Sequence, residues 1–253
     1  MSDLTRRVHR LVREASEARE QPVELPLEAP LHMEVNGVRL AMLMRLPGHD
    51  RELALGFWLT DGLISGRDDV ATMYYCPDDP NVLRIRLTRE VPERRAMAIG
   101  TACGGILGGE LPEPVPMEGS TVPAGVLMGL PAKLQERQPV RRRVGVLHGA
   151  GTFTHDGTLV GAYEDVGRHN AMDKALGHCV LRGEQLGDKI VVITGRGSAE
   201  LVIKAARARI PILCSTAMLT SLGAELAEQL GLTLVARLRH DHLEVFSHPE
   251  RVA

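Results

Sequence analysis

A single cysteine stands in the glycine-rich stretch TACGGILGGE, residues 101–110. Thiolate chemistry needs an accessible sulfur and an electrostatic environment that favours the anion. The glycines around Cys103 permit both, because they allow close approach and leave backbone N–H groups free to act as donors. The other cysteines lie beside acidic residues (Cys76) or within apolar segments (Cys179 and Cys214). Cys103 is therefore the best candidate nucleophile, and a buried, unreactive thiol is the alternative.

The densest polar cluster is EDVGRHNAMDK, residues 164–174. A helix is predicted to follow its glycine, and backbone N–H groups at a helix start suit an anion such as phosphate. Arg168 adds a forked donor for phosphate or for a guanine edge, with His169 beside it. The alternative is a self-satisfied turn, in which Asp165 bonds the backbone and Arg168 bonds Glu164.

Two further segments are candidates for anion binding. TGRGSAE (194–200) follows a predicted buried strand and begins a predicted helix, which is a common arrangement for binding phosphate. The alternative is that Ser198 serves only as the N-cap of that helix. RLRHDH (237–242) joins the last two predicted strands, and a solvated hairpin turn is its alternative. Its residues are Arg237, Leu238, Arg239, His240, Asp241 and His242. The arginine run 141–143 we interpret as ordinary surface charge.

Composition excludes several classes of protein. The chain has 253 residues and a net charge of -2, which lacks the basic footprint of a nucleic-acid-binding protein. No apolar run approaches the roughly 20 residues of a membrane span, and the charged N-terminus has no apolar secretory segment. We therefore expect a cytoplasmic protein that binds neither nucleic acid nor membrane. A zinc deaminase needs H-x-E followed by P-C-x-x-C, a combination absent here, so we expect no metal site and disfavour a nucleotide hydrolase.

The elements that must position these segments follow from periodicity. Asn36-Gly37 predicts a hairpin turn within 31–43, a helix is predicted from Asp50 to about Gly62, and alternation predicts a strand at 81–88. In the second half, strands are predicted at 144–154, 158–165, 189–194, 211–216, 232–238 and 242–248. Helices are predicted at 169–181, 199–209 and 221–231. This alternation favours a layered α/β fold. Residues 1–20 are predicted to form a charged helix or to lack regular structure, and the proline-rich stretch 110–123 is predicted to be a linker.

With these motifs in view, the sequence resembles the FdhD family of accessory proteins for formate dehydrogenase. The matching stretches are EVNGVRLAMLMRLPGHDRELALGFWLTDGLI, TACG, LHGAGTF, YEDVGRHNAMDKALG, GRGSAELVIKAARARIPIL, AELAEQLGLTLVARLR and FSHPER. After the charged extension at 1–20, we expect a smaller N-terminal α+β part at 21–115 that carries Cys103. For the C-terminal domain at 116–253, the resemblance implies a cytidine-deaminase-like α/β layered fold.

The resemblance also implies a role as a sulfurtransferase. Family members take sulfur from a cysteine desulfurase as a persulfide on the cysteine that matches Cys103. They pass it to the molybdenum or tungsten of a bis-guanine-dinucleotide pterin, Mo-bis(molybdopterin guanine dinucleotide), which formate dehydrogenase requires, and they are typically homodimers. Residues 237–242 match the family's cofactor-binding stretch, and Arg168 and His169 match its signature. The second cysteine of the family's C-G-x-C-G loop is Ile106 here, so a cofactor-holding chaperone without sulfur transfer is the alternative.

Overall fold

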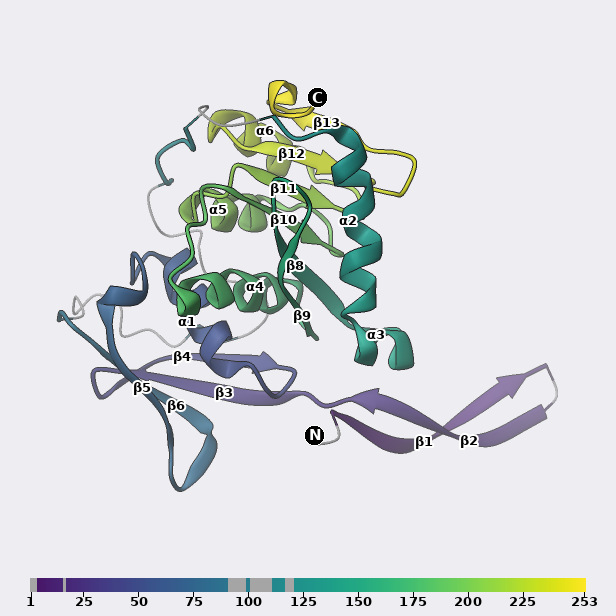
Figure 1. Cartoon of the computed structure of the whole chain (residues 1–253). Coiled ribbons are helices and arrows are strands. Elements are labelled where there is room, and N and C mark those ends of the chain that lie inside the picture. Colours follow the sequence, from purple (N-terminus) through teal and green to yellow (C-terminus); the bar gives the residue numbers. More distant parts are fainter. Residues whose placement is uncertain (1–3, 16, 91–98, 101–110, 117–120) are drawn as a thin grey trace.

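The computed structural model describes residues 4–15, 17–90, 99–100, 111–116 and 121–253 (Figure 1). Within these residues the strands form a two-stranded hairpin, a five-stranded sheet and a six-stranded sheet. The predicted fold class, a two-part α/β chain, is confirmed. None of the helices in these ranges is long and apolar enough to cross a bilayer.

The N-terminal part is built on the five-stranded sheet, in the order β5-β6-β3-β4-β7. Its strands are β3 (Ala29–Val35), β4 (Val38–Arg45), β5 (Val70–Cys76), β6 (Asp79–Leu87) and β7 (Ile99–Gly100). The predicted hairpin is confirmed, because Asn36 and Gly37 link β3 to β4 with φ of 50° and 86°. The predicted helix is α1 (Asp50–Asp61), which ends at Gly62 in the left-handed conformation. A short 3₁₀ turn at Arg67–Asp69 precedes β5.

The six-stranded sheet forms the C-terminal part, in the order β13-β12-β11-β10-β8-β9. Its strands are β8 (His148–Thr154), β9 (Leu159–Asp165), β10 (Lys189–Ile193), β11 (Ile212–Ser215), β12 (Thr233–Ala236) and β13 (Glu244–Ser247). The middle strands β10, β11 and β12 run parallel to one another, while β8 and β13 run antiparallel to their neighbours. All six predicted strands of this half are confirmed.

Helices cover both faces of this sheet (Figure 1). On one face lies α2 (Ala124–Glu136), followed by α3 (Pro139–Val144), and on the other lie α4 (Arg168–Arg182), α5 (Ala199–Arg207) and α6 (Ser221–Gln229). Because successive side chains of β10 point to opposite faces of the sheet, the hydrophobic core has two parts. Ile190 and Val192 pack with the leucines of α2, whereas Val191 and Ile193 pack towards the helices on the other face. The sequence patterns had predicted α4, α5 and α6 but not α2, α3 or β5.

Two glycines let α1 and α4 cross in close contact. A Cβ on Gly56 would lie 1.8 Å from the carbonyl oxygen of Asp173, and a Cβ on Gly177 would lie 1.8 Å from that of Glu52. Because no other residue fits at either position, this crossing fixes how the two parts of the chain pack.

The stretch 110–123, which was predicted to be a linker, is attached to the C-terminal part at Val115, whose N–H donates to Leu230 O at 2.8 Å. The boundaries near residues 20 and 115 stay predictions.

The expectation of a helix or irregular chain at residues 1–20 is wrong for the described residues. β1 (Thr5–Glu14) and β2 (Glu17–Pro26) pair antiparallel along their whole length and project from the body (Figure 1). The physical reason is long-range pairing, which overrides local helical preference: Val8 lies opposite Val23. Arg143 of α3 holds the base of the hairpin, with its Nε 3.1 Å from a Glu24 carboxylate oxygen.

Candidate functional site

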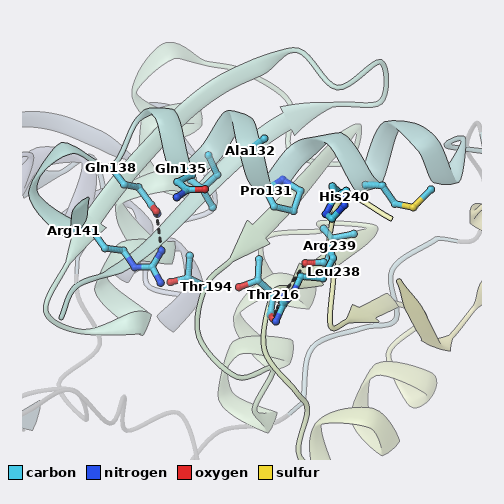
Figure 2. Close-up of a pocket in the computed structure, with 12 residues that line it drawn as sticks. Pro131, Ala132, Gln135, Gln138, Arg141, Thr194, Thr216, Leu238, Arg239 and His240 are labelled. Atoms are coloured by element: carbon cyan, nitrogen blue, oxygen red, sulfur yellow. Dashed lines mark hydrogen bonds between the residues drawn. The ribbon is translucent and has the colours of Figure 1, made fainter. Parts of the chain in front are cut away.

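A cleft of about 330 Å³ opens at the carboxyl ends of β10 and β11, beneath α2 and α3 (Figure 2). In open α/β sheets this edge is the usual position of a ligand. The lining residues are Met128, Pro131, Ala132, Leu134, Gln135, Gln138, Arg141, Thr194, Thr216, Leu238, Arg239 and His240. Figure 2 shows Arg141 at one end and Arg239 with His240 at the other, while Thr194 and Thr216 lie between them.

The two threonines are positioned by the strands that they end. Thr194 exchanges two hydrogen bonds with Gly149 of β8: Gly149 N donates to Thr194 Oγ1 at 2.9 Å, and Thr194 N donates to Gly149 O at 2.9 Å. The hydroxyl hydrogen of Thr194 has no acceptor among the described residues, so it remains available to a ligand. Thr216 N donates to Ile193 O at 3.0 Å, which holds the end of β11 beside that of β10.

Glu164 positions Arg141. Its carboxylate accepts hydrogen bonds from Val140 N at 3.1 Å and from Arg141 N at 2.6 Å, which caps the start of α3. Burial raises the pKa of Glu164, and these two backbone donors oppose that effect. Arg141 Nη1 donates to Gln138 Oε1 at 3.2 Å, as the dashed line in Figure 2 marks. These hydrogen bonds hold Arg141 in place in the lining of the cleft. Its interpretation as ordinary surface charge was therefore wrong.

Only part of the predicted segment 237–242 lines the cleft. Arg237 leaves β12 with a left-handed φ of 46°, and its side chain pairs with Glu244 at 3.1 Å. Leu238 is fully buried, and its N–H donates to Ser215 O at 3.1 Å. Arg239 then bends back and donates to the carbonyl of Thr216, so it lines the cleft together with His240. Asp241 and His242 are exposed and are absent from the lining.

Arg168 lies at the same edge of the sheet. A Cβ on Gly195, which follows β10, would meet the Arg168 stem at 3.0 Å, so the arginine crosses over this glycine. Its Nε is buried and has no hydrogen-bond partner in the described part of the chain. Burial lowers the pKa of His148, at the start of β8, and the positive charges of Arg168 and Arg141 lower it further. Arg168 therefore adds positive charge to this edge of the sheet, next to the cleft that Arg141 and Arg239 line.

His169 and the rest of the 164–174 cluster make contacts within the protein. His169 is buried, with Nε2 2.9 Å from a carboxylate oxygen of Glu200 on α5. Asp165 accepts from Gly167 N at 3.0 Å, as the self-satisfied turn predicts. Arg168, however, does not bond Glu164, because that carboxylate is used by α3. A role for His169 in binding a ligand stays a prediction.

The same cluster joins the two parts of the chain. Asn170 Nδ2 donates to Met44 O at 2.7 Å, and Leu46 N donates to Asp165 Oδ2 at 3.2 Å. Lys174 Nζ lies 2.7 Å from Asp165 Oδ2 and donates to Leu46 O at 2.9 Å. The most polar motif of the sequence is thus mainly a structural junction.

Cys103, the predicted nucleophile, lies outside the described residues, as does Ile106. The burial predicted for Cys179 and Cys214 is confirmed, since neither has exposed surface. Burial raises the pKa of both thiols, which disfavours thiolate. Cys76 is half-buried at the end of β5. Over the described ranges, no group of three or more His, Cys, Asp and Glu side chains is arranged to hold a metal ion.

Sequence reasoning missed Gln138, Arg141 and Thr216 as parts of the candidate site, whereas Thr194 is the first residue of the predicted segment 194–200. For Thr216 a signal was present, because it closes the apolar strand PILCST as Thr194 closes KIVVIT. For Gln138 and Arg141 no local signal existed, since α2 and α3 reach the cleft only through packing on the sheet.

Known proteins match almost the whole chain. The model of the FdhD/NarQ family matches residues 26–253. A protein of Nocardia farcinica named "Sulfur carrier protein FdhD" is 39% identical over 263 residues, which cover 98% of this chain and 94% of that protein. One of the same name from Mycobacterium tuberculosis is 35% identical over 270 residues, covering 96% and 98%. A crystal structure of a protein assigned as a formate dehydrogenase accessory protein, from Desulfotalea psychrophila, has a TM-score of 0.81 at 26% identity and covers 99% of this chain and 100% of that one.

Proposed function

The chain belongs to the FdhD/NarQ family, and from this premise we propose that it is a sulfur carrier that serves formate dehydrogenase. In this proposal Cys103 accepts sulfur from a cysteine desulfurase as a persulfide. The recipient is the molybdenum or tungsten of the bis-guanine-dinucleotide pterin cofactor, which the protein binds as a substrate.

The cleft at the carboxyl ends of β10 and β11 carries the proposal. Arg141 and Arg239 lie at its two ends, threonine hydroxyls lie between them, and the described lining contains no acidic side chain. A dinucleotide brings several phosphate charges in a row, and arginine offers forked donors that match phosphate oxygens. Cations at both ends of one cleft suit such an elongated anion better than a single phosphate.

The sulfur step requires a thiolate at Cys103. The thiolate attacks the terminal sulfur of the desulfurase persulfide, a bond forms between Cys103 Sγ and that sulfur, and the desulfurase cysteine leaves as thiolate. No net oxidation occurs in this exchange. Burial disfavours two of the other cysteines as carriers, because Cys179 and Cys214 are fully buried with raised pKa values. The half-buried Cys76 is the remaining rival to Cys103.

Intact-protein mass spectrometry tests the carrier role. The protein is incubated with a cysteine desulfurase and cysteine, alongside the Cys103→Ala variant and the matched control Cys76→Ala. We expect the mass to rise by one sulfur atom in the wild type and the control, to fall back on reduction, and to stay unchanged in Cys103→Ala.

The replacement of the second loop cysteine by Ile106 favours a second candidate, a chaperone that holds the cofactor without carrying sulfur. An unmodified wild type that still binds GDP would support that candidate. A wild type that neither gains sulfur nor binds guanine nucleotide would overturn both.

A further inference from the structure

Three side chains on the Arg141 side of the cleft carry hydrogen-bond donors that lack acceptors in the described part of the chain. Gln138 and Arg141 reach the cleft from the helical wall, and Thr194 reaches it from the end of β10 (Figure 2). Gln138 Nε2 and Arg141 Nε are buried and have no partner within the described ranges. Buried donors in native proteins are nearly always paired, so a group of unpaired donors calls for a ligand that supplies the acceptors.

The amide of Gln138 has a fixed orientation. Arg141 Nη1 donates to Gln138 Oε1 at 3.2 Å, and an arginine can only donate, so the amide oxygen must face Arg141. The NH2 group of the amide therefore keeps its hydrogens for another acceptor. Gln138 is only 1% exposed, and a Cβ on Gly149 would lie 1.4 Å from Gln138 Nε2. The NH2 group thus rests on Gly149 of β8 and does not reach bulk water.

Thr194 brings a second donor to the same glycine. Thr194 Oγ1 accepts from Gly149 N at 2.9 Å, which holds the hydroxyl oxygen in place and leaves its hydrogen to donate. Because Gly149 contacts both side chains, the Gln138 NH2 group and the Thr194 hydroxyl lie close together. With the Arg141 guanidinium they form a cluster that we call the donor pocket (Gln138, Arg141 and Thr194).

The donor pocket carries a positive charge. The side chain of Arg141 is bound to the uncharged amide of Gln138, and it forms no ion pair with any described carboxylate. The carboxylate of Glu164 is directed instead at the backbone, where it accepts from Val140 N at 3.1 Å and from Arg141 N at 2.6 Å. The pocket therefore combines an uncompensated guanidinium with two neutral donors, and this combination selects an anion.

A tetrahedral oxyanion fits this arrangement better than a nucleobase does. The donors come from two walls of the cleft, so they approach a shared ligand from different directions. A phosphate group presents several charged oxygens that accept hydrogen bonds from different directions, and such charge-assisted bonds are strong. A guanine base is planar and mixes the acceptors O6 and N7 with N–H donors, which would face the donors of the pocket.

We propose that the donor pocket binds the terminal phosphate of a guanine nucleotide, and that Gln138 is a determinant of its affinity. The nucleoside extends along the cleft towards Arg239 and His240 at the other end (Figure 2). In the dinucleotide cofactor, the same pocket holds the phosphate on the pterin side. This inference rests on the proposed function, which supplies the nucleotide, and it assigns the direction in which the nucleotide lies.

Calorimetry with GDP and GMP tests the pocket, because the two ligands differ only in the terminal phosphate. The wild type should bind GDP about tenfold more tightly than GMP, as charge-assisted hydrogen bonds predict. Gln138→Met keeps the approximate length of the side chain but removes the donors. It should lower GDP affinity about tenfold and leave GMP affinity unchanged, so that the two ligands bind almost equally.

Gln138→Glu gives a sharper contrast. The new carboxylate keeps an oxygen for Arg141, so the wall of the cleft stays in place, but it sets a negative charge against the phosphate. Like charges placed together cost several kcal/mol, so GDP affinity should fall about a hundredfold, with a much smaller loss for GMP. Gln229→Met, on the exposed surface of α6, repeats the glutamine-to-methionine change away from the cleft and should bind both nucleotides as the wild type does.

Thr194 supplies an independent pair of variants. Thr194→Val has the same shape without the hydroxyl and should also bring the affinities for GDP and GMP together, whereas Thr194→Ser keeps the donor and should retain the wild-type preference for GDP. Thr194→Val also removes the acceptor of Gly149 N, so urea titration must show that it folds. Gln138→Met leaves that hydrogen bond intact and decides the question if Thr194→Val does not fold.

The outcomes separate this inference from the proposed function. If the wild type binds GDP but the Gln138 variants weaken GDP and GMP equally, the base occupies the donor pocket and the inference is overturned, while the proposed function stands. GDP affinity that stays at the wild-type value in both Gln138 variants overturns it in the same way. A wild type that binds no GDP overturns the inference together with the cofactor-binding part of the proposed function.

Discussion

Charged residues gather in two regions of this molecule and are used in opposite ways. At the junction of α1, α4 and α5, Lys204 Nζ lies 2.8 Å from both carboxylate oxygens of Asp173 and 2.7 Å from Thr60 Oγ1, all of them buried. In the cleft, Arg239 is exposed and donates hydrogen bonds to the backbone carbonyls of Thr216 and Leu238, so its charge has no carboxylate partner among the described residues. A cluster whose charges cancel inside the protein is structural, and one whose charges remain unpaired at a cleft is free to bind an ion.

The junction also shows the cost of burying charge. Complete burial raises the pKa of Asp173 although the charge of Lys204 opposes this, which means that desolvation outweighs the attraction. Such a pair holds two parts of a chain in one arrangement without adding much net stability. Removing one partner, however, leaves the other buried and unpaired.

The largest expected effect tests the junction directly. Asp173→Ala leaves the ammonium of Lys204 buried without its counter-ion, and we expect the free energy of unfolding to fall by about 3–5 kcal/mol in urea titration. The control is Arg237→Ala, which breaks the exposed pair with Glu244 and should cost less than about 1 kcal/mol. The double variant Asp173→Leu with Lys204→Met should recover most of the loss. Equal effects for Asp173→Ala and Arg237→Ala would contradict the contrast between the two regions.

A second test addresses the packing that brings the junction together. Gly56→Ala would place a methyl group 1.8 Å from the Asp173 carbonyl oxygen, and forcing α1 from α4 should cost about 1–3 kcal/mol of unfolding free energy. Gly129→Ala, in α2, is the matched control because its Cβ would meet no atom within 4 Å. That variant should be stabilised by about 0.5–1 kcal/mol through helix propensity. A melting temperature unchanged in Gly56→Ala would mean that the helix crossing is loose.

The third test compares two arginines of the cleft segment. Arg239→Ala removes a cation that lines the cleft, and we expect calorimetry to show GDP affinity reduced about tenfold or more, the usual loss for a charge-assisted hydrogen bond. Arg237→Ala should leave the affinity unchanged, since Arg237 faces Glu244 instead. Both variants should keep the free energy of unfolding within about 1 kcal/mol of the wild type. Equal losses of affinity would move the nucleotide outside the cleft.

The smallest expected effect is a pH dependence at the cleft edge. Burial, followed by the charges of Arg168 and Arg141, depresses the pKa of His148 in the folded protein. The unfolded chain therefore binds more protons near pH 6, and stability should fall as pH drops below the ordinary histidine pKa. His148→Gln should remove a slope worth up to about 1 kcal/mol between pH 7.5 and 5.5 in urea titrations. An identical slope in wild type and variant would show that neither burial nor the charges of Arg168 and Arg141 depress the pKa of His148 in the folded protein.

Local sequence signals predicted most of the elements. Asn36-Gly37 predicts a turn because both residues tolerate positive φ, and Gly62 ends α1 for the same reason. The apolar runs of β10 and β11 predict buried strands because their carboxyl-end neighbours are glycine or small polar residues. The hairpin of β1 and β2 was not predicted, because its strands are stabilised by pairing with each other and by the contact of Glu24 with Arg143. No local sequence pattern reveals these contacts.

The sequence by itself determined the family, the layered α/β class, the candidate thiol Cys103 and the polar motifs, because these depend on residue identity and short-range periodicity. Only the tertiary structure decided which charges line the cleft and which are buried in pairs. Asp165 and Lys174 belong to the most polar motif of the sequence, and packing buries them against each other. Arg141 is interpreted from the sequence as surface charge, and the packing of α3 brings it to the carboxyl ends of β10 and β11. The physical reason is that the function of a charge depends on its solvation and partners, which residues far apart in the sequence supply.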